Sequence, residues 1–506
     1  PSEGRPAGAS KRLFVGLSDR KKHEPYVMKI LFLNPSYGKG FCKTARWFAK
    51  SRAREQRHPD YICVAIAVLE RDGHVCKFID GAAGDLSFLD TRTAFREFDP
   101  DMAVINATTP SIDSDITYVR MCKEESNGRA ITVMTGPHAS AEPEDTLKRG
   151  QGFLDIIARR EYDWTLKDIA AGSSFSNIQG VSYFNSGKIV HNPDRQFIQD
   201  LDSLPFPAWR HIDPKNYYSP AKRNPFLTLV TGRGCEGRCV FCLFPQVMYG
   251  REYRYRSPEN VLDEMQYDVK LFPNLKEIMF EDDTFTLAKY SARLENICEG
   301  ILDRKIKISW SCNSRAEIGD LSILKLMKKA GCRMMCVGFE SGDDEMLKSL
   351  KKGITSDRMR NFAVLARKAG ISVHGCFVIG APGETPDSVE KTIKFAVKLP
   401  IDTVQFSGLC AYPGTEFYNW CKDNNYIAAK DWKDWVDEKK EQRAIIDYPQ
   451  LSCSAMNKAV DRALYSFYLR PGYIFSQIIH PKSFHDIKAR LKGLYQFGTY
   501  YLRKSR

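Results

Sequence analysis

The stretch TGRGCEGRCVFCLFPQ, residues 231–246, places three cysteines, Cys235, Cys239 and Cys242, within eight positions of the chain. They are separated by three residues and then by two, and no fourth cysteine follows nearby. The stretch comes directly after FLTLV, an apolar β-rich run, so the cysteines are predicted to lie in a loop at the carboxyl end of a strand. Active-site groups are expected at that end in parallel α/β folds.

Thiols at this density favour a soft or borderline metal, chiefly zinc or an iron–sulfur cluster. A structural zinc site needs four closed ligands, usually in two separated pairs. No second pair follows, so a zinc hypothesis would have to recruit isolated residues such as Cys312 or His374. Three thiolates on a four-iron cluster leave one iron free for a substrate or cofactor. The missing ligand therefore favours the cluster over zinc.

The three cysteines open a series of strand and helix patterns that runs from about residue 225 to 425. Its strand-like segments are FLTLVTG, EIMFEDDTFT, KISWSCNSR, MMCVGFESG, SVHGCFVIGAPGE and TVQFSGLCAYPG, with helical patterns such as SPENVLDEMQYDVKLF between them. Six β/α units in a row predict an open or partial barrel, with its site at the carboxyl ends of the strands.

The part of the chain before this series, residues 27 to about 172, has a doubly wound rhythm. Five short apolar runs, VMKILFLNP, VCKFID, DMAVINATTPS, AITVMTGPHAS and FLDIIARREYDW, alternate with helical patterns and predict a parallel sheet. Ligands of such sheets bind beyond the carboxyl ends of the strands. Those ends carry Asn34, Asp80, Thr108 to Ser111, Gly136 to Ser140, and Arg159 to Glu161.

The patterns divide the chain into five parts of an α/β protein. We expect a flexible tail over residues 1–25, a doubly wound domain over 26–175, a hairpin and proline-bearing linker over 176–223, the partial (β/α)6 barrel over 224–428, and a helical C-terminal region over 429–506. The hairpin is predicted to turn at Asn185-Ser186-Gly187.

Composition narrows the class of protein. With 506 residues, 43% hydrophobic and 27% charged, the chain has the composition of a globular protein of two or three domains. Its fifteen cysteines are scattered through core-like patterns, which favours a reducing compartment, so we expect a cytoplasmic protein. The sequence shows neither a membrane-spanning apolar run nor a signal-peptide pattern.

The net charge of +13 is concentrated near the C-terminus. From Lys458 to Arg506 there are ten Lys and Arg against two Asp and Glu, interleaved with ten Phe and Tyr. This pattern suits a peripheral contact with the inner face of a membrane or with a lipid substrate, and equally a helical subdomain with a solvated basic face. Both interpretations stay open, and neither favours nucleic acid as a partner.

The cysteine spacing, with an aromatic Phe241 before the last cysteine, resembles the radical S-adenosylmethionine (SAM) superfamily, and the resemblance covers nearly the whole chain. It implies a 4Fe-4S cluster on Cys235, Cys239 and Cys242, with SAM on the open iron. Reduction then releases a 5′-deoxyadenosyl radical in that superfamily. An external electron donor such as flavodoxin or ferredoxin is also implied.

Other segments match that superfamily residue by residue. The resemblance assigns to SAM binding the residues Asp282 and Asp283 in EDDTFT, Ser311, Asn313 and Arg315 in SCNSRAE, Glu340 in VGFESG, and Gly380 and Gly383 in GAPGE. Each also has a structural interpretation: the two aspartates as helix caps, the arginine as a surface ion pair, and the glycines as a tight turn.

The amino-terminal domain resembles the cobalamin-binding domain of one large radical SAM subfamily. The Asp-x-His-x-x-Gly signature, whose His binds cobalt from below, is absent from the loop ATTPSIDSD, and His138 lies in the next loop. The resemblance therefore implies cobalamin held with its base displaced and without a lower His ligand.

The closest likeness is to the hopanoid-biosynthesis branch, which includes bacteriohopanetetrol cyclitol ether synthase. Arg160-Glu161-Tyr162-Asp163 stands where most cobalamin domains have Gly-Glu-Gly-Glu, and this supports that branch. The resemblance implies rearrangement or cyclisation of a membrane-associated lipid head group, or of another small molecule. The alternatives are a cobalamin-dependent C-methyltransferase, an anaerobic tetrapyrrole cyclase and, with less support, an RNA-modifying iron–sulfur enzyme.

Overall fold

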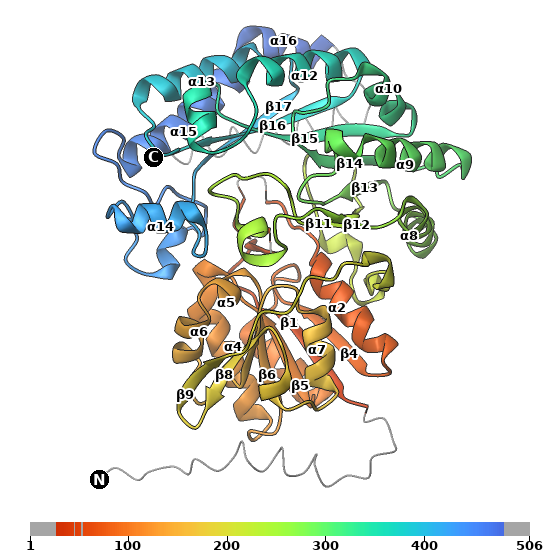
Figure 1. Cartoon of the computed structure of the whole chain (residues 1–506), viewed down its shortest axis with the longest axis vertical. Helices are drawn as coiled ribbons and strands as arrows, with labels where there is room; N and C mark the ends of the chain where they lie inside the picture. The colour runs from red at the N-terminus through yellow and green to blue at the C-terminus, as the bar shows by residue number, and fades with distance from the viewer. Residues whose placement is uncertain (1–26, 45, 52–53, 480–506) are drawn as a thin grey trace. The chain divides into compact units, whose positions relative to one another are not determined.

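The computed structural model describes residues 27–44, 46–51 and 54–479, which form two compact units that are described separately (Figure 1). Among the described residues, the first unit contains the chain up to Lys39, then Tyr61–Ile198 and Leu204–Ile212. The second contains Gly40–Asp60, Gln199–Ser203 and the described residues from Asp213 onward. The predicted flexible tail, residues 1–25, and the end of the predicted C-terminal region, residues 480–506, lie outside the described residues.

The first unit is built on a seven-stranded sheet in the order β4-β1-β5-β6-β7-β8-β9. Its strands are β1 (Lys29–Asn34), β4 (Val75–Asp80), β5 (Met102–Asn106), β6 (Ile131–Thr135), β7 (Ile156–Ala158), β8 (Val181–Asn185) and β9 (Lys188–His191). The first five pair in parallel, as the alternating pattern predicts. The hairpin β8–β9 turns where predicted and extends this sheet by antiparallel pairing with β7.

Central strands such as β1 and β5 are buried along almost their whole length. This burial indicates that helices cover both faces of the first sheet. The helices are α2 (Asp60–Arg71), α3 (Phe88–Phe98), α4 (Ile112–Glu125), α5 (Pro137–Ala141), α6 (Pro143–Arg149) and α7 (Asp163–Ala170). The order of the parallel strands reverses direction between β1 and β5. A doubly wound sheet binds its ligand at this switch point, beyond the carboxyl ends of the strands.

The second unit contains six parallel strands in the order β10-β13-β14-β15-β16-β17. They are β10 (Phe226–Leu229), β13 (Glu277–Phe280), β14 (Ser309–Ser314), β15 (Cys332–Glu340), β16 (Ser372–Ile379) and β17 (Thr403–Gly408). Every neighbouring pair is parallel. The order is linear, so the sheet is an open arc, and the predicted partial barrel is confirmed.

Helices lie along the outer side of this curved sheet (Figure 1). The helices of the unit are α8 (Pro258–Leu271), α9 (Ser291–Asp303), α10 (Leu321–Lys329), α11 (Asp344–Ser349), α12 (Ser356–Ala369), α13 (Pro386–Lys398), α14 (Glu416–Asp423), α15 (Cys453–Tyr468) and α16 (Pro471–Ile479). None of the described helices is long and apolar enough to span a membrane.

Burial alternates along the strands of the second sheet. In β16 the positions Val373, Gly375 and Phe377 are buried, and the intervening ones are half-buried. Since successive side chains of a strand point to opposite faces, the half-buried set lies on the face that helices leave uncovered. We call this set the inner face: Asn313, Cys336, Gly338, His374, Cys376, Val378, Thr403, Gln405 and Ser407.

A segment from the amino-terminal part of the chain, Gly40–Asp60, belongs to the second unit by its contacts. It contains the short antiparallel pair β2 (Cys42–Lys43) and β3 (Phe48–Ala49). The Lys50 amide donates to the Lys440 carbonyl at 2.7 Å, and the ring centroids of Phe48 and Tyr412 are 4.9 Å apart. The sequence patterns gave no indication that this segment packs there.

Candidate active site

The cysteine loop begins where β10 ends. After Leu229 the chain forms β11 (Gly232–Arg233), which pairs antiparallel with β12 (Arg254–Tyr255) and closes the loop at its base. Gly234 lies between β11 and the first cysteine with a φ of 88°. A Cβ there would lie 2.1 Å from the Glu252 carbonyl oxygen, so only glycine fits this position.

The two aspartates that follow β13 hold the loop in place. The buried Asp282 carboxylate accepts bonds from the Thr231 amide at 2.6 Å and from the Thr231 hydroxyl at 2.5 Å. Burial raises the pKa of Asp282, and the bonds from Thr231 oppose that rise. The Asp283 carboxylate accepts from the Gly234 amide at 3.0 Å. In the structure both aspartates therefore position the loop, and their predicted contacts with SAM stay predictions.

Two side chains that follow the three cysteines in the chain tie the backbone of the loop together. The Gln246 amide nitrogen donates to the carbonyl oxygens of Val240 at 3.0 Å and Cys242 at 2.8 Å. Gln246 lies in η6 (Phe244–Met248), the helical turn that follows the last cysteine. Arg251 donates to the Gly237 carbonyl at 2.6 Å. These bonds hold the backbone of the loop, and the sequence patterns did not single out either residue.

The three thiols suit a cluster of several irons better than a single ion. Cys235 and Cys239 are buried and Cys242 is half-buried, and all fifteen cysteines of the chain are free. Burial raises the pKa of Cys235 and Cys242, and the Asp283 carboxylate adds to that rise. In the part of the chain that the structure describes, the sulfur atoms of the three loop cysteines do not all lie within 4.8 Å of one another. One tetrahedral ion needs its thiolates closer, at roughly 4 Å.

One predicted arginine and one predicted glutamate lie beside the loop. The Arg315 guanidinium is 3.8 Å from the Cys239 sulfur and donates to the Lys352 carbonyl at 2.5 Å. The Lys352 ammonium is 2.7 Å from the Glu340 carboxylate, and both side chains are buried. Glu340 has a φ of 65°, which is costly for a residue with a Cβ, and it lies at a register shift of β15. Such strain at a charged pair is typical of a functional site.

Two other predicted cofactor-binding residues, Asn313 and Ser311, differ in how close they lie to the cysteine loop. Asn313 donates to the Asp282 carbonyl at 3.1 Å, next to the loop. The Ser311 hydroxyl donates to Glu277 at 2.6 Å and accepts from Lys222 at 3.0 Å, so the structure does not bring it to the cysteines.

The glycine turn after β16 also has partners of its own. The Gly380 carbonyl accepts from the Tyr448 hydroxyl at 2.9 Å, and its amide donates to the buried Glu384 carboxylate. Gly383 has a φ of 80°, and a Cβ there would meet nothing within 4 Å. The Glu384 carboxylate therefore holds the glycine turn in place. The predicted role of the turn in binding SAM stays a prediction.

The segment Gly40–Asp60 supplies a cation to the loop that the sequence analysis missed. The Arg46 guanidinium lies 2.7 Å from the Asp283 carboxylate and 4.4 Å from the centre of the Phe244 ring. Asp283 therefore joins this segment and the cysteine loop in one contact. Arg46 lies 237 positions before Asp283 in the chain, and nothing local marks it as a partner of Asp283.

The same segment brings charges to the inner part of the second unit. Arg57 pairs with Glu55 at 3.3 Å and with Glu281 at 3.4 Å. Burial alone would raise the pKa of Glu55, but Arg57 holds it below its ordinary value. Asp60 accepts a hydrogen bond from the Thr228 hydroxyl of β10. Burial, with the nearby charge of Glu281, raises the pKa of Asp60 to about 8.

At the switch point of the first unit, polar side chains are bonded to one another. The Asn34 amide donates to Asp80 at 2.9 Å and accepts from Asn106 at 3.0 Å. The hydroxyls of Thr108 and Ser111 are 2.7 Å apart. These contacts hold the loops after β1, β4 and β5 at the edge where a doubly wound sheet takes its ligand.

His138 is buried at the start of α5, and its Nδ1 lies 3.3 Å from the Thr109 hydroxyl. Burial lowers the pKa of His138, so the ring is neutral at physiological pH. A carboxylate oxygen of Asp145 lies 3.9 Å from its Nε2. These contacts fit a histidine that stabilises the loops.

The residues after β7 are held within the first unit. The Arg159 guanidinium donates to the Val181 carbonyl at 2.9 Å and to Asp194 at 2.8 Å, so this side chain ties β7 to the hairpin. Arg160 has a φ of 62°, and Glu161 accepts from the Ile198 amide at 2.8 Å. The positive φ at Arg160 is the conformation that glycine would adopt more easily.

Comparison with known proteins identifies what these two units are. Residues 229–396 match the radical SAM superfamily, and residues 52–168 match the B12 binding domain. An uncharacterized methyltransferase of Pyrococcus horikoshii is 33% identical over 433 residues, 85% of this chain and 92% of that protein. The chain belongs to the cobalamin-binding radical SAM family. It is therefore an enzyme whose cofactors are a 4Fe-4S cluster, SAM and cobalamin, as the sequence predicted.

Two further proteins are similar to this one over most of the chain. The anaerobic magnesium-protoporphyrin IX monomethyl ester cyclase of Rubrivivax gelatinosus is 25% identical over 409 residues, 77% of this chain and 69% of that protein. The solved structure of the radical SAM methyltransferase TsrM from Kitasatospora setae, with cobalamin and a 4Fe-4S cluster bound, has a TM-score of 0.67 at 16% identity. It covers 88% of this chain and 90% of that one, and it confirms the fold.

The geometry of Gly234 gives a direct test of the loop. Gly234→Ala is expected to lower the iron bound after anaerobic reconstitution several-fold, because the Cβ would collide with the Glu252 carbonyl and displace Cys235. The matched control is Gly370→Ala, which also has a positive φ, of 77°, but no atom closer than 3.7 Å. We expect the control to bind iron normally. Full cluster occupancy in Gly234→Ala would refute the constraint.

The raised pKa of Asp60 gives a dependence of stability on pH. The folded chain keeps the proton up to about pH 8, whereas the unfolded chain releases it near about pH 4. Stability contributed by this group therefore falls as pH rises between those values. Asp60→Asn is expected to flatten the profile of Tm against pH and to raise Tm at pH 8. Asp303→Asn, an exposed carboxylate, should leave the profile unchanged, and an unflattened profile in Asp60→Asn would contradict the assignment.

Proposed function

We propose that this enzyme is a cobalamin-dependent radical SAM C-methyltransferase. The observation that carries the proposal is the 33% identity to a methyltransferase along 85% of this chain, through both units. Methyl transfer uses both matched domains, because when bound the cluster and SAM supply a hydrogen-abstracting radical and the corrinoid carries the methyl group.

The residues of the second unit would hold the cluster and SAM. Cys235, Cys239 and Cys242 are the ligands that we assign to the iron, with Asp282 and Asp283 fixing their loop. Arg315 and the Lys352–Glu340 pair lie on the Cys239 side of the loop, where they would orient the charged amino-acid end of SAM. Their bonds to one another hold these groups in place before SAM arrives.

The inner face of the second sheet is where we place the substrate. It carries amide and hydroxyl groups, among them Asn313, Thr403, Gln405 and Ser407, on strands whose other face is packed against helices. Rigid strands hold such groups more precisely than loops do, and a reacting C–H bond must be held close to the radical.

For cobalamin we assign the loops at the carboxyl edge of the first sheet, chiefly those that begin at Ala107, Gly136 and Arg159. His138 in the second of these loops is buried against Thr109. This supports cobalamin bound with its base displaced and without a lower His ligand, as the sequence resemblance implies.

Rearrangement of a hopanoid head group, the first hypothesis from the sequence, has less support than methyl transfer. Its support was the likeness to one branch and the basic aromatic C-terminus, and the residues after 479 lie outside those the structure describes. A lipid substrate and a peripheral membrane contact stay predictions of the sequence.

The products separate these reactions. The reconstituted enzyme, a chemical reductant and SAM with a deuterated methyl group are incubated anaerobically with metabolite and lipid extracts of a deletion strain. Methyl transfer is expected to give S-adenosylhomocysteine and 5′-deoxyadenosine in equal amounts, with the deuterated methyl in a new product. Cys239→Ala should give none of the three. A new product without the label, formed with 5′-deoxyadenosine alone, would overturn methyl transfer in favour of rearrangement or cyclisation.

A further inference from the structure

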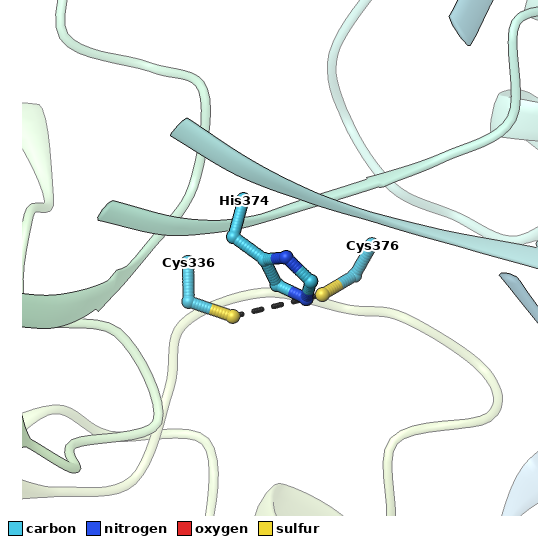
Figure 2. Close-up of side chains that lie close together, drawn as sticks. All are labelled: Cys336, His374 and Cys376. Atoms are coloured by element: carbon cyan, nitrogen blue, oxygen red, sulfur yellow. Dashed lines mark hydrogen bonds between the residues drawn. The ribbon is translucent and has the colours of Figure 1, made fainter. Parts of the chain in front are cut away.

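Three side chains of types that bind metals, all outside the cysteine loop, converge on the inner face (Figure 2). Cys336 comes from β15, and His374 and Cys376 come from β16. Their ligand atoms lie within 4.8 Å of one another, and no other such group of three occurs among the residues that the structure describes. The two sulfurs are 3.6 Å apart. Two thiolates on one tetrahedral zinc ion lie about 3.8 Å apart, so little movement is needed.

The strand register produces this convergence. Cys336 lies opposite His374, and Gly338 lies opposite Cys376. Positions two apart on one strand share a face, so all three side chains leave the sheet on the same side. Gly338 has no side chain, and the Glu340 carboxylate and the Lys352 ammonium fill the space that a Cβ there would take. The group is therefore built by two rigid strands and not by a loop.

The imidazole is already oriented as a metal ligand. Its Nδ1 is 2.8 Å from the Thr403 hydroxyl on the neighbouring strand β17. Figure 2 shows the other ring nitrogen turned toward the sulfurs. A partner on one nitrogen fixes the orientation of the ring, as in many metal sites, so that the other nitrogen faces the sulfurs. Gln405, the register partner of Cys376, also lies beside this ring.

A disulfide is the competing explanation, and the register argues against it. Cys336 and Cys376 are diagonal neighbours, because Cys336 faces His374. Neighbouring strands lie about 4.8 Å apart and two residues span about 6.6 Å along a strand, so the Cα atoms of diagonal positions are roughly 8 Å apart, beyond the roughly 4.4–6.8 Å that a disulfide spans. Closing that bond would require the strands to shift.

We propose that Cys336, His374 and Cys376 bind one divalent metal ion of borderline softness, Zn2+ being the best match, on the inner face of the second sheet. Binding displaces the two thiol protons to solvent and leaves the fourth tetrahedral position open to the inner face. Two thiolates and one imidazole with an open position are the ligand set of a catalytic zinc site. The site is separate from the iron–sulfur site and does not depend on methyl transfer.

Cobalt binding tests the site without reference to activity. The chain is first loaded with its 4Fe-4S cluster, so that the loop thiols are occupied, and Co2+ is then titrated in anaerobically. We expect one Co2+ per chain with thiolate-to-cobalt charge-transfer bands and tetrahedral d–d bands, both removed by Zn2+. Cys336→Ser and Cys376→Ser are expected to abolish these bands. Thr403→Val should weaken binding roughly tenfold or more, because the ring loses its orienting partner.

The control is Cys453→Ser, a half-buried thiol at the start of α15 that lies outside the group. It should bind Co2+ like the unchanged chain. Iron content and circular dichroism establish that each variant is folded, and His374→Gln provides a second route if a cysteine variant is not. The proposal is overturned if the bands are absent, if they persist in both cysteine variants, or if mass spectrometry of the reduced, anaerobic chain finds a Cys336–Cys376 disulfide.

Discussion

Two consecutive carboxylates after β13 determine where the cluster can lie. Asp282 holds the chain before the loop through Thr231, and Asp283 holds it at Gly234, directly before the first cysteine. Burying a carboxylate costs free energy unless hydrogen bonds offset the loss of water, and Asp282 receives such bonds from both groups of Thr231. Asp283 also binds Arg46, so the short stretch that follows β13 joins the loop, the sheet and the inserted segment.

This arrangement gives the two aspartates a structural role. The sequence alone could not distinguish such a role from ligand binding. A helix cap, a SAM contact and a loop anchor all require an exposed or bonded carboxylate after a strand. Asp282 is buried and bonded to Thr231, so it anchors the loop, and its predicted contact with SAM stays a prediction. The charged groups next to Cys239 are instead Arg315, Glu340 and Lys352, and of these Lys352 had no sequence signal.

The strands of both sheets followed from the sequence because their signal is local. Apolar runs such as KILFLN and the alternation in SVHGCFVI report burial within a few residues. The packing of Gly40–Asp60 on the second unit is not local, since Arg46 and Asp283 are 237 positions apart. The same limit applies to the inner-face group: Cys336 and His374 meet through strand register, which no spacing in one sequence reveals.

The central claim is that the three-cysteine loop leaves one iron for SAM. It is tested most directly by electron–nuclear double resonance on the reduced, four-iron enzyme with SAM labelled isotopically in its amino and carboxylate groups. The account predicts hyperfine coupling between the cluster and both labels, because both groups bind the iron that lacks a cysteine. A fully loaded cluster that shows no coupling to either label, at SAM concentrations that saturate binding, would contradict it.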